Sequence, residues 1–141
     1  MISLADIFTK SHRNLEVLLK RAVAGLDDRV LSMDAFVLFR TSIEGHMAAE
    51  ETVLFPYYES LPDRSMGLTE ILRKGHKELR VFFMELADAI TTQDVDEARV
   101  IMHVVTQMLE HHDNKEESEL YPALNGQRLP VALDDLARQI A

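Results

Sequence analysis

One short pattern with the residue types of a metal site occurs twice in the chain. Residues 46–56 and residues 112–122 both read His-x-x-x-Glu-Glu-x-x-Leu-aromatic-Pro, without a gap. Side chains four positions apart lie on the same face of a helix, so each copy places an imidazole beside a carboxylate. An imidazole and a carboxylate on one face, repeated on a second helix, are suitable ligands for a metal site between helices. The two pairs are His46 with Glu50 and His112 with Glu116.

A second repeated pattern precedes each of these pairs. His12 and His76 each begin a stretch that reads His-basic-x-Leu-x-Val-apolar. The chain therefore reads as one helical hairpin used twice, in which each hairpin contributes two histidines and one glutamate. Because a buried ionised carboxylate without partners is costly, the alternative is a polar core in which two His–Glu pairs neutralise each other without metal. The six candidate metal ligands are His12, His46, Glu50, His76, His112 and Glu116.

Four helices are needed to bring these six side chains together, and the apolar periodicity of the sequence predicts them. Short connections between four long helices predict an all-α, up-down-up-down four-helix bundle, which we expect to be a single domain spanning residues 1–141. Residues 129–140 predict a short amphipathic C-terminal helix that covers the end of the bundle or makes a homo-oligomer contact. The first long helix is expected at about residues 4–23, ending at Gly25, and the second from Ser32 or Asp34 to the loop at 61–67. The third is expected at 68–90 and the fourth from Asp94 to the turn at Asn125. Pro56 is expected to disturb the second helix, and Pro122 the fourth.

Composition excludes several classes of protein. A chain of 141 residues with 47% hydrophobic residues has the length and content of one folded domain. The net charge of -9 argues against nucleic acid or an anionic membrane as a partner. The absence of cysteine excludes thiolate metal sites and iron–sulfur clusters. Because the sequence has no signal peptide pattern and no long apolar run, we expect a cytoplasmic location.

The second glutamate of each motif is expected to play a different role from the first. Glu51 and Glu117 point about 140° around the helix from the histidines that precede them. They are therefore expected to support the ligands or to lie at the surface, paired with Arg13, Lys77 or Arg80. A direct ligand role for the two glutamates is the alternative.

With these residues placed, the chain resembles the hemerythrin-like, cation-binding four-helix-bundle domains over about residues 4–122. The resemblance rests on the six candidate ligands and on the Glu-Glu-x-x-Leu-aromatic-Pro sequence that ends each motif. It implies a non-haem di-iron centre, with Glu50 and Glu116 bridging two iron ions and the four histidines in terminal positions. Imidazole and carboxylate also suit manganese or zinc, so the ligand types leave the metal open and the resemblance favours iron.

The chain departs from the oxygen-carrying hemerythrins in two ways. Those proteins have a His-x-x-x-His pair on the third helix, whereas Leu72 and Arg80 stand four positions from His76 here. They also end with His-x-x-x-x-Asp, where this chain has a His-x-x-x-Glu pair. The missing histidine leaves one metal position that water, substrate or a tyrosine could fill.

Three tyrosines near the motifs are expected to pack in the core or at an interface, and the alternative is that one of them fills the vacant metal position. They are Tyr57, Tyr58 and Tyr121. Other polar residues fall off the inward faces and are expected at the surface. These are Glu44, His103, Glu110 and His111, and for His111 the alternative is a position that supports the ligands.

The missing histidine argues against reversible oxygen carriage. The first hypothesis is a hemerythrin-like di-iron protein that binds or reacts with O2, peroxide or nitric oxide. The second is an iron-binding module that stores, delivers or senses iron without turnover. The third is a structural bundle that holds zinc or no metal. The sequence leaves open whether the protein is an enzyme.

Overall fold

The computed structural model describes residues 2–27, 33–65 and 67–141, and within these ranges the chain forms helices and connecting loops without a strand. Four of the described helices are long, and a short π-helical segment follows two of them. The elements are α1 (Leu4–Asp27), α2 (Met33–Ala49), η1 (Glu50–Leu54), α3 (Phe55–Glu59), α4 (Leu68–Thr91), α5 (Val95–Lys115), η2 (Glu116–Leu120), α6 (Tyr121–Leu124) and α7 (Leu133–Gln139).

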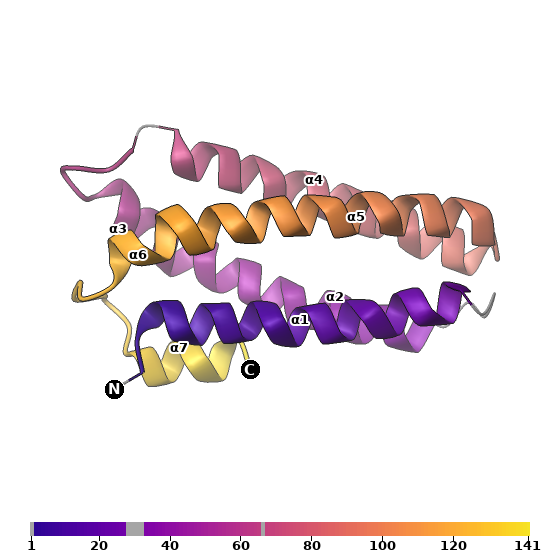
Figure 1. The fold of residues 1–141 in the computed structure, drawn as a ribbon, viewed down its shortest axis with the longest axis horizontal. Coiled ribbons are helices and arrows are strands. Elements are labelled where there is room, and N and C mark those ends of the chain that lie inside the picture. The colour runs from indigo at the N-terminus through magenta and orange to yellow at the C-terminus, as the bar shows by residue number, and fades with distance from the viewer. Residues whose placement is uncertain (1, 28–32, 66) are drawn as a thin grey trace.

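The four long helices lie side by side, and consecutive ones run in opposite directions (Figure 1). α1 packs against α2 and α5, and α4 packs against α5 and α2. Residues far apart in the sequence therefore meet in the interior between these helices. None of the described helices is long and apolar enough to cross a membrane.

α1 is longer than the sequence predicted, because it continues through Gly25 to Asp27. A glycine inside a helix costs about 1 kcal/mol relative to alanine. Leu26 is 4% exposed, and burial of a leucine side chain contributes about 1.5–3 kcal/mol. The burial of Leu26 therefore outweighs the cost of Gly25. Ser32, one of the two predicted starts of the second helix, lies outside the described residues.

The other helix ends agree with their local sequence. α5 begins as predicted after Asp94, whose carboxylate accepts a hydrogen bond from the backbone N–H of Glu97 at 3.1 Å. This cap satisfies one backbone donor of the first helical turn. α7 is shorter than predicted, because the residue before Pro130 is disfavoured in a helix and Ala132 is extended.

Two apolar clusters fill the interior on either side of a polar layer. In α4, for example, His76 lies between Leu72 of one cluster and Leu79 of the other. The Phe83 cluster includes Leu15, Ile43, Leu79, Phe83 and Leu109, and the Phe8 cluster includes Phe8, Leu72, Leu120, Tyr121 and Leu124. The buried polar residues in the described part of the chain are Ser11, His12, His46, Glu50, Thr69, His76 and Glu116.

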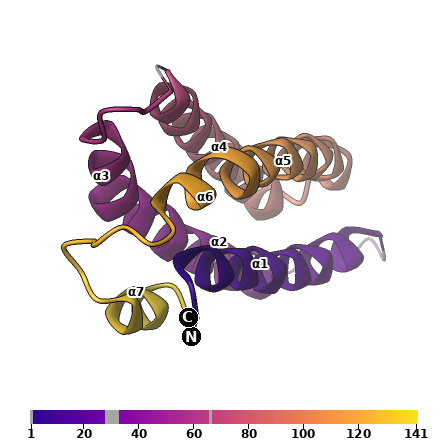
Figure 2. The same ribbon diagram turned by 60° about the vertical axis from the view of Figure 1, so that its left-hand side comes forward.

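The tail helix α7 packs against α1 and α2 near the end of the molecule where the N-terminus lies (Figure 2). Leu136 is fully buried in the Phe8 cluster, and Ile140 is nearly so. Gly45 in α2 lies against the tail, and a Cβ atom at this position would make an ordinary contact with the carbonyl oxygen of Gln139 at 3.4 Å. The tail therefore completes the Phe8 cluster.

Candidate metal centre

Each repeated motif contains a π-helical turn. η1 and η2 begin at Glu50 and Glu116, and the backbone N–H groups of Phe55 and Tyr121 bond to the carbonyl oxygens of these glutamates. The next residue is proline in both cases and has no N–H to continue an α-helical pattern. Since a π turn bonds residues five positions apart, each glutamate and its aromatic residue share one face. Such turns often mark functional sites.

The structure brings all six predicted side chains together in the buried polar layer. They form two groups of four, and the atoms that could hold a metal ion lie within 4.8 Å of one another in each group. Both groups contain the same two glutamates, which is the arrangement that two bridging carboxylates require. The first half-site is His12, His46, Glu50 and Glu116, and the second half-site is His76, His112, Glu50 and Glu116.

The first half-site draws its histidines from α1 and α2. His12 Nε2 lies 3.2 Å from Glu116 Oε1. His46 Nε2 lies 3.5 Å from Glu50 Oε2. Both imidazoles therefore present Nε2 to the carboxylates.

The second half-site draws its histidines from α4 and α5. His76 Nε2 and His112 Nε2 lie 3.1 Å apart. Glu50 Oε1 lies 3.3 Å from His76 Nε2, and Glu116 Oε2 lies 3.3 Å from His112 Nε2. Neither of these two buried oxygens has a hydrogen-bond partner within the described residues. Because unpaired buried carboxylate oxygens are costly, this donor set fits a cation.

The Nδ1 atoms of the first half-site have partners that fix the orientation of both rings. His12 Nδ1 donates to Glu117 Oε2 at 2.7 Å, and Arg13 donates to both oxygens of Glu117 at 2.8 Å. His46 Nδ1 lies 2.8 Å from Ser11 Oγ in the buried interior. Holding the hydrogen on Nδ1 leaves the lone pair of Nε2 free for a metal.

An equivalent contact supports His76 in the second half-site. His76 Nδ1 donates to Glu51 Oε2 at 2.7 Å. Arg80 donates to the same carboxylate at 2.7 and 3.0 Å and also to Glu44 at 3.1 Å. The expected pairing of Glu51 and Glu117 with arginines is therefore observed, and each glutamate in addition binds a histidine of the other half of the chain.

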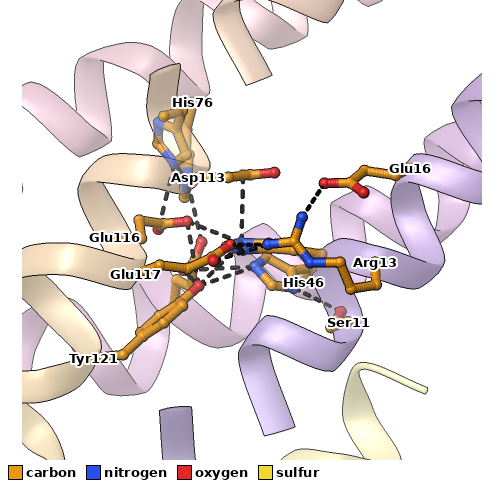
Figure 3. Close-up of polar contacts among 12 residues, drawn as sticks. Ser11, Arg13, Glu16, His46, His76, Asp113, Glu116, Glu117 and Tyr121 are labelled. Atoms are coloured by element: carbon orange, nitrogen blue, oxygen red, sulfur yellow. Dashed lines mark hydrogen bonds and ion pairs between the residues drawn. The ribbon is translucent and has the colours of Figure 1, made fainter. Parts of the chain in front are cut away.

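The Tyr121 hydroxyl lies in the first half-site (Figure 3). It donates to Glu50 Oε2 at 2.7 Å and lies 3.2 Å from Glu116 Oε1. It also lies 3.1 Å from His12 Nε2 and 3.4 Å from His46 Nε2. Tyr121 is thus the tyrosine that reaches the centre. Tyr57 is half-buried, and the hydroxyl of buried Tyr58 accepts from the backbone N–H of Ser65 at 2.7 Å.

The motif and the arrangement agree with one known family. The family model of the hemerythrin HHE cation-binding domain matches residues 3–124. The chain belongs to this hemerythrin family. The match covers the six predicted residues and both π turns, and it leaves α7 outside. No curated protein and no solved structure matches the chain significantly.

The two shared carboxyl groups of this hemerythrin domain have pKa values shifted in opposite directions. Burial and the charge of Glu50 raise the pKa of Glu116 well above its ordinary value. Burial also acts to raise the pKa of Glu50, but the charge of His46 and the close contacts of the carboxylate with Glu116, His46 and His76 outweigh burial, and the net shift is well below the ordinary value. Without a cation, Glu116 therefore keeps a proton, which a metal ion would replace.

Two histidines of the hemerythrin site are neutral at physiological pH. Burial, helped by the charge of His46, lowers the pKa of His12 to about 2. Burial likewise lowers the pKa of His112 to about 4. Neutral imidazole is the form that binds metal ions, so the site needs no proton loss from these two rings.

A groove between α1 and α5 leads to the site. It has a volume of about 770 Å³, and its lining includes His12 of the first half-site and Asp113. The same two residues also line a cavity of about 10 Å³ beside the six predicted residues. A cavity of that volume holds about one water molecule. The groove is lined in its apolar part by Leu15, Leu19, Val23, Ala24, Leu26, Met102 and Leu109.

Three residues that shape the site were not predicted from the sequence. Ser11 binds His46, and Asp113 lies 3.3 Å from His12 Nε2. Gly75 lies against His112, because a Cβ atom at Gly75 would be 2.9 Å from Nδ1 of that ring. A glycine inside a helical pattern next to a candidate ligand is the one signal that the sequence offered for this close approach.

The residues expected at the surface are mostly there. His103, Glu110 and His111 are exposed. Glu44 is partly exposed and accepts hydrogen bonds from Arg80. Arg80 on α4 reaches Glu44 on α2, and spacing along a single helix does not predict such a contact.

Proposed function

We propose that this chain is a non-haem di-iron hemerythrin-like protein that binds or reacts with O2, peroxide or nitric oxide. In this proposal, residues 1–141 form a single domain, an up-down-up-down four-helix bundle built from two hairpin repeats. Two iron ions are held by the six residues of the half-sites, which are His12, His46, Glu50, His76, His112 and Glu116.

The observation that carries the proposal is the pair of ligand groups that share Glu50 and Glu116. One carboxylate oxygen of each glutamate faces the first half-site and the other faces the second. Two buried oxygens lack any hydrogen-bond partner among the described residues. A polar core formed for packing alone would pair these atoms, so the arrangement supports a site for two cations.

The chemistry of the donors supports iron or manganese for a reactive site and zinc for an inert one. A bound pair of redox-active ions would supply electron transfer to a small oxygen or nitrogen species. The chain itself orients three of the imidazoles through their Nδ1 partners, which are Glu117, Ser11 and Glu51. The two apolar clusters keep bulk water away from the layer. The groove at His12 and Asp113 gives a small molecule a route to the layer.

Metal content and the visible spectrum test this proposal. The protein is expressed with iron supplied, and spectra are recorded in air and again after peroxide or nitric oxide is added. We expect two irons per chain and an absorption band that changes with the small molecule. His12→Ala and Glu116→Ala should each lower the iron content and the thermal stability of the iron-loaded protein, because each removes a donor from the shared site.

His111→Ala is the matched control, since His111 is exposed and stands directly before His112. It should leave iron content and melting temperature unchanged. Zinc or no metal, with a featureless spectrum after anaerobic iron loading, would contradict the proposal and leave a structural role. Iron that is bound and released without any spectral response to small molecules would indicate storage, delivery or sensing instead.

A further inference from the structure

One difference between the two half-sites is a hydroxyl group. Phe55 and Tyr121 occupy the same place in the two repeats, five residues after the shared glutamate and at the end of a π turn. Both side chains are fully buried. The Tyr121 ring lies 5.6 Å from the His12 ring, and the Phe55 ring lies 5.3 Å from the His76 ring. Of these two equivalent residues, Tyr121 therefore brings an oxygen atom to its half-site and Phe55 does not.

This hydroxyl completes a set of five donor atoms in the first half-site. Tyr121 Oη lies 2.7 to 3.4 Å from the four inward atoms of the two histidines and the two glutamates. Adjacent ligands of a six-coordinate metal at about 2.1 Å lie about 3 Å apart. The observed separations fit five ligands around one ion.

The second half-site has four donor atoms and no counterpart of the hydroxyl. Its unpaired carboxylate oxygens indicate that no hydrogen-bonding group in the described part of the chain takes the place that Tyr121 Oη has in the other half. Arg80, one helical turn after His76, does not fill it, because its guanidinium binds Glu51 and Glu44. An ion bound here would have one more open position than an ion in the first half-site.

We propose that Tyr121 is a ligand of the first half-site and that the small exogenous ligand binds to the ion of the second half-site, which His76 and His112 would hold. The ligand class is a small anion or diatomic molecule, because the cavity beside the six residues measures about 10 Å³. The inference rests on the proposed function, since it assumes that both half-sites hold iron. Metal sites that accept an external ligand keep such an open position, whereas filled sites do not.

Exchanging the two aromatic residues tests the inference, with azide as the probe. Iron content, the tyrosinate-to-iron absorption band and the azide dissociation constant are measured on the iron-loaded full chain. Tyr121→Phe should abolish the tyrosinate band and change the azide dissociation constant by less than about threefold. Phe55→Tyr adds a hydroxyl to the second half-site and should weaken azide binding by about tenfold or more.

Phe55→Leu is the control, because it removes the ring without adding a donor atom. It should leave the azide dissociation constant within about threefold of the parent. If Phe55→Tyr does not fold, Tyr121→Phe still decides the question, and metal-free circular dichroism identifies this case. Azide that binds about tenfold more tightly to Tyr121→Phe, with no tyrosinate band in the parent, would overturn the inference. Equal azide binding in all variants that hold two irons would also overturn the inference, but it would leave the proposed function intact. A parent protein that binds no iron would overturn the proposed function itself.

Discussion

His76 donates its Nδ1 hydrogen to Glu51 at 2.7 Å, although the histidine lies on α4 and the glutamate on the π turn after α2. His12 on α1 and Glu117 on the π turn after α5 make the equivalent contact at the same distance. Each glutamate therefore orients a histidine that belongs to the other half of the chain. An arginine holds each of these carboxylates in place.

Removing the negative charge at either contact should weaken metal binding. Partners of this kind raise the basicity of a ligating histidine, and their loss typically costs about 10–100-fold in metal affinity. Glu51→Gln and Glu117→Gln are therefore expected to bind iron about 10–100-fold more weakly, measured by competition with a chelator. Glu44→Gln is the control, because Glu44 binds Arg80 and no histidine of the site. Equal affinities in all three variants would show that the contacts are only structural.

Gly75→Ala should displace His112. The added Cβ atom would lie 2.9 Å from His112 Nδ1, which is too close for an ordinary contact. Alanine also favours the helix by about 1 kcal/mol, so the metal-free variant should still fold. We expect iron affinity to fall by about tenfold or more in a calorimetric titration. Gly45→Ala is the control, because its Cβ atom would lie 3.4 Å from its nearest neighbour, and unchanged affinity in both variants would contradict the prediction.

The metal-free protein should lose stability between pH 6.5 and pH 8. Burial, with the charges of Glu50 and Glu117, raises the pKa of Asp113 from 3.8 to about 8. Folded Asp113 therefore keeps a proton that the unfolded chain has released, and the stability this contributes is lost as the pH rises through the folded pKa. His12 and His112 have lowered pKa values and act in the opposite direction, but only below their unfolded value of 6.5.

Urea denaturation at pH 6.5 and pH 8 in the presence of a chelator measures this effect. The parent should lose on the order of 1–2 kcal/mol of unfolding free energy over this interval. Asp113→Asn cannot titrate at this position and should lose less. An identical loss in parent and variant would assign the pH dependence to other groups, of which Glu116, with its raised pKa, is the first candidate.

Leu136→Ala should destabilise the whole domain. Leu136 is fully buried in the Phe8 cluster, although it lies in the short tail helix. Truncating a buried leucine to alanine costs about 2–5 kcal/mol, and urea denaturation should report a loss in this range. Leu133→Ala, at a partly exposed position of the same helix, should cost less. A negligible effect at Leu136 would mean that the tail does not contribute to the folded core in solution.

The six residues of the half-sites could be found from the sequence because helical spacing fixes which side chains share a face. His46 and Glu50 are four positions apart, and the repeat at His112 and Glu116 shows that this spacing is not accidental. The pairing of Glu51 with an arginine was also predictable from the direction of its side chain. The histidine that Glu51 binds was not predictable, because its position depends on how the neighbouring helix packs.

Tyr121 could be named but not placed from the sequence. An α-helix puts residues five positions apart about 140° from each other, so Tyr121 should point away from Glu116. The π turn removes this rotation, and no simple sequence rule predicts a π turn. Ser11 and Asp113 were missed for another reason. Each reaches a histidine on a different long helix, and spacing along one helix does not describe such contacts.

The crossed contacts between the two halves of the chain also set the order of events in biosynthesis. When residues 1–65 have left the ribosome, His12 still lacks Glu117 and Glu51 still lacks His76. The nascent chain at this stage contains three of the six candidate ligands, and neither of the two histidine–glutamate contacts can form. Full-strength capture of a metal ion by the six residues would therefore follow translation of the second half of the chain.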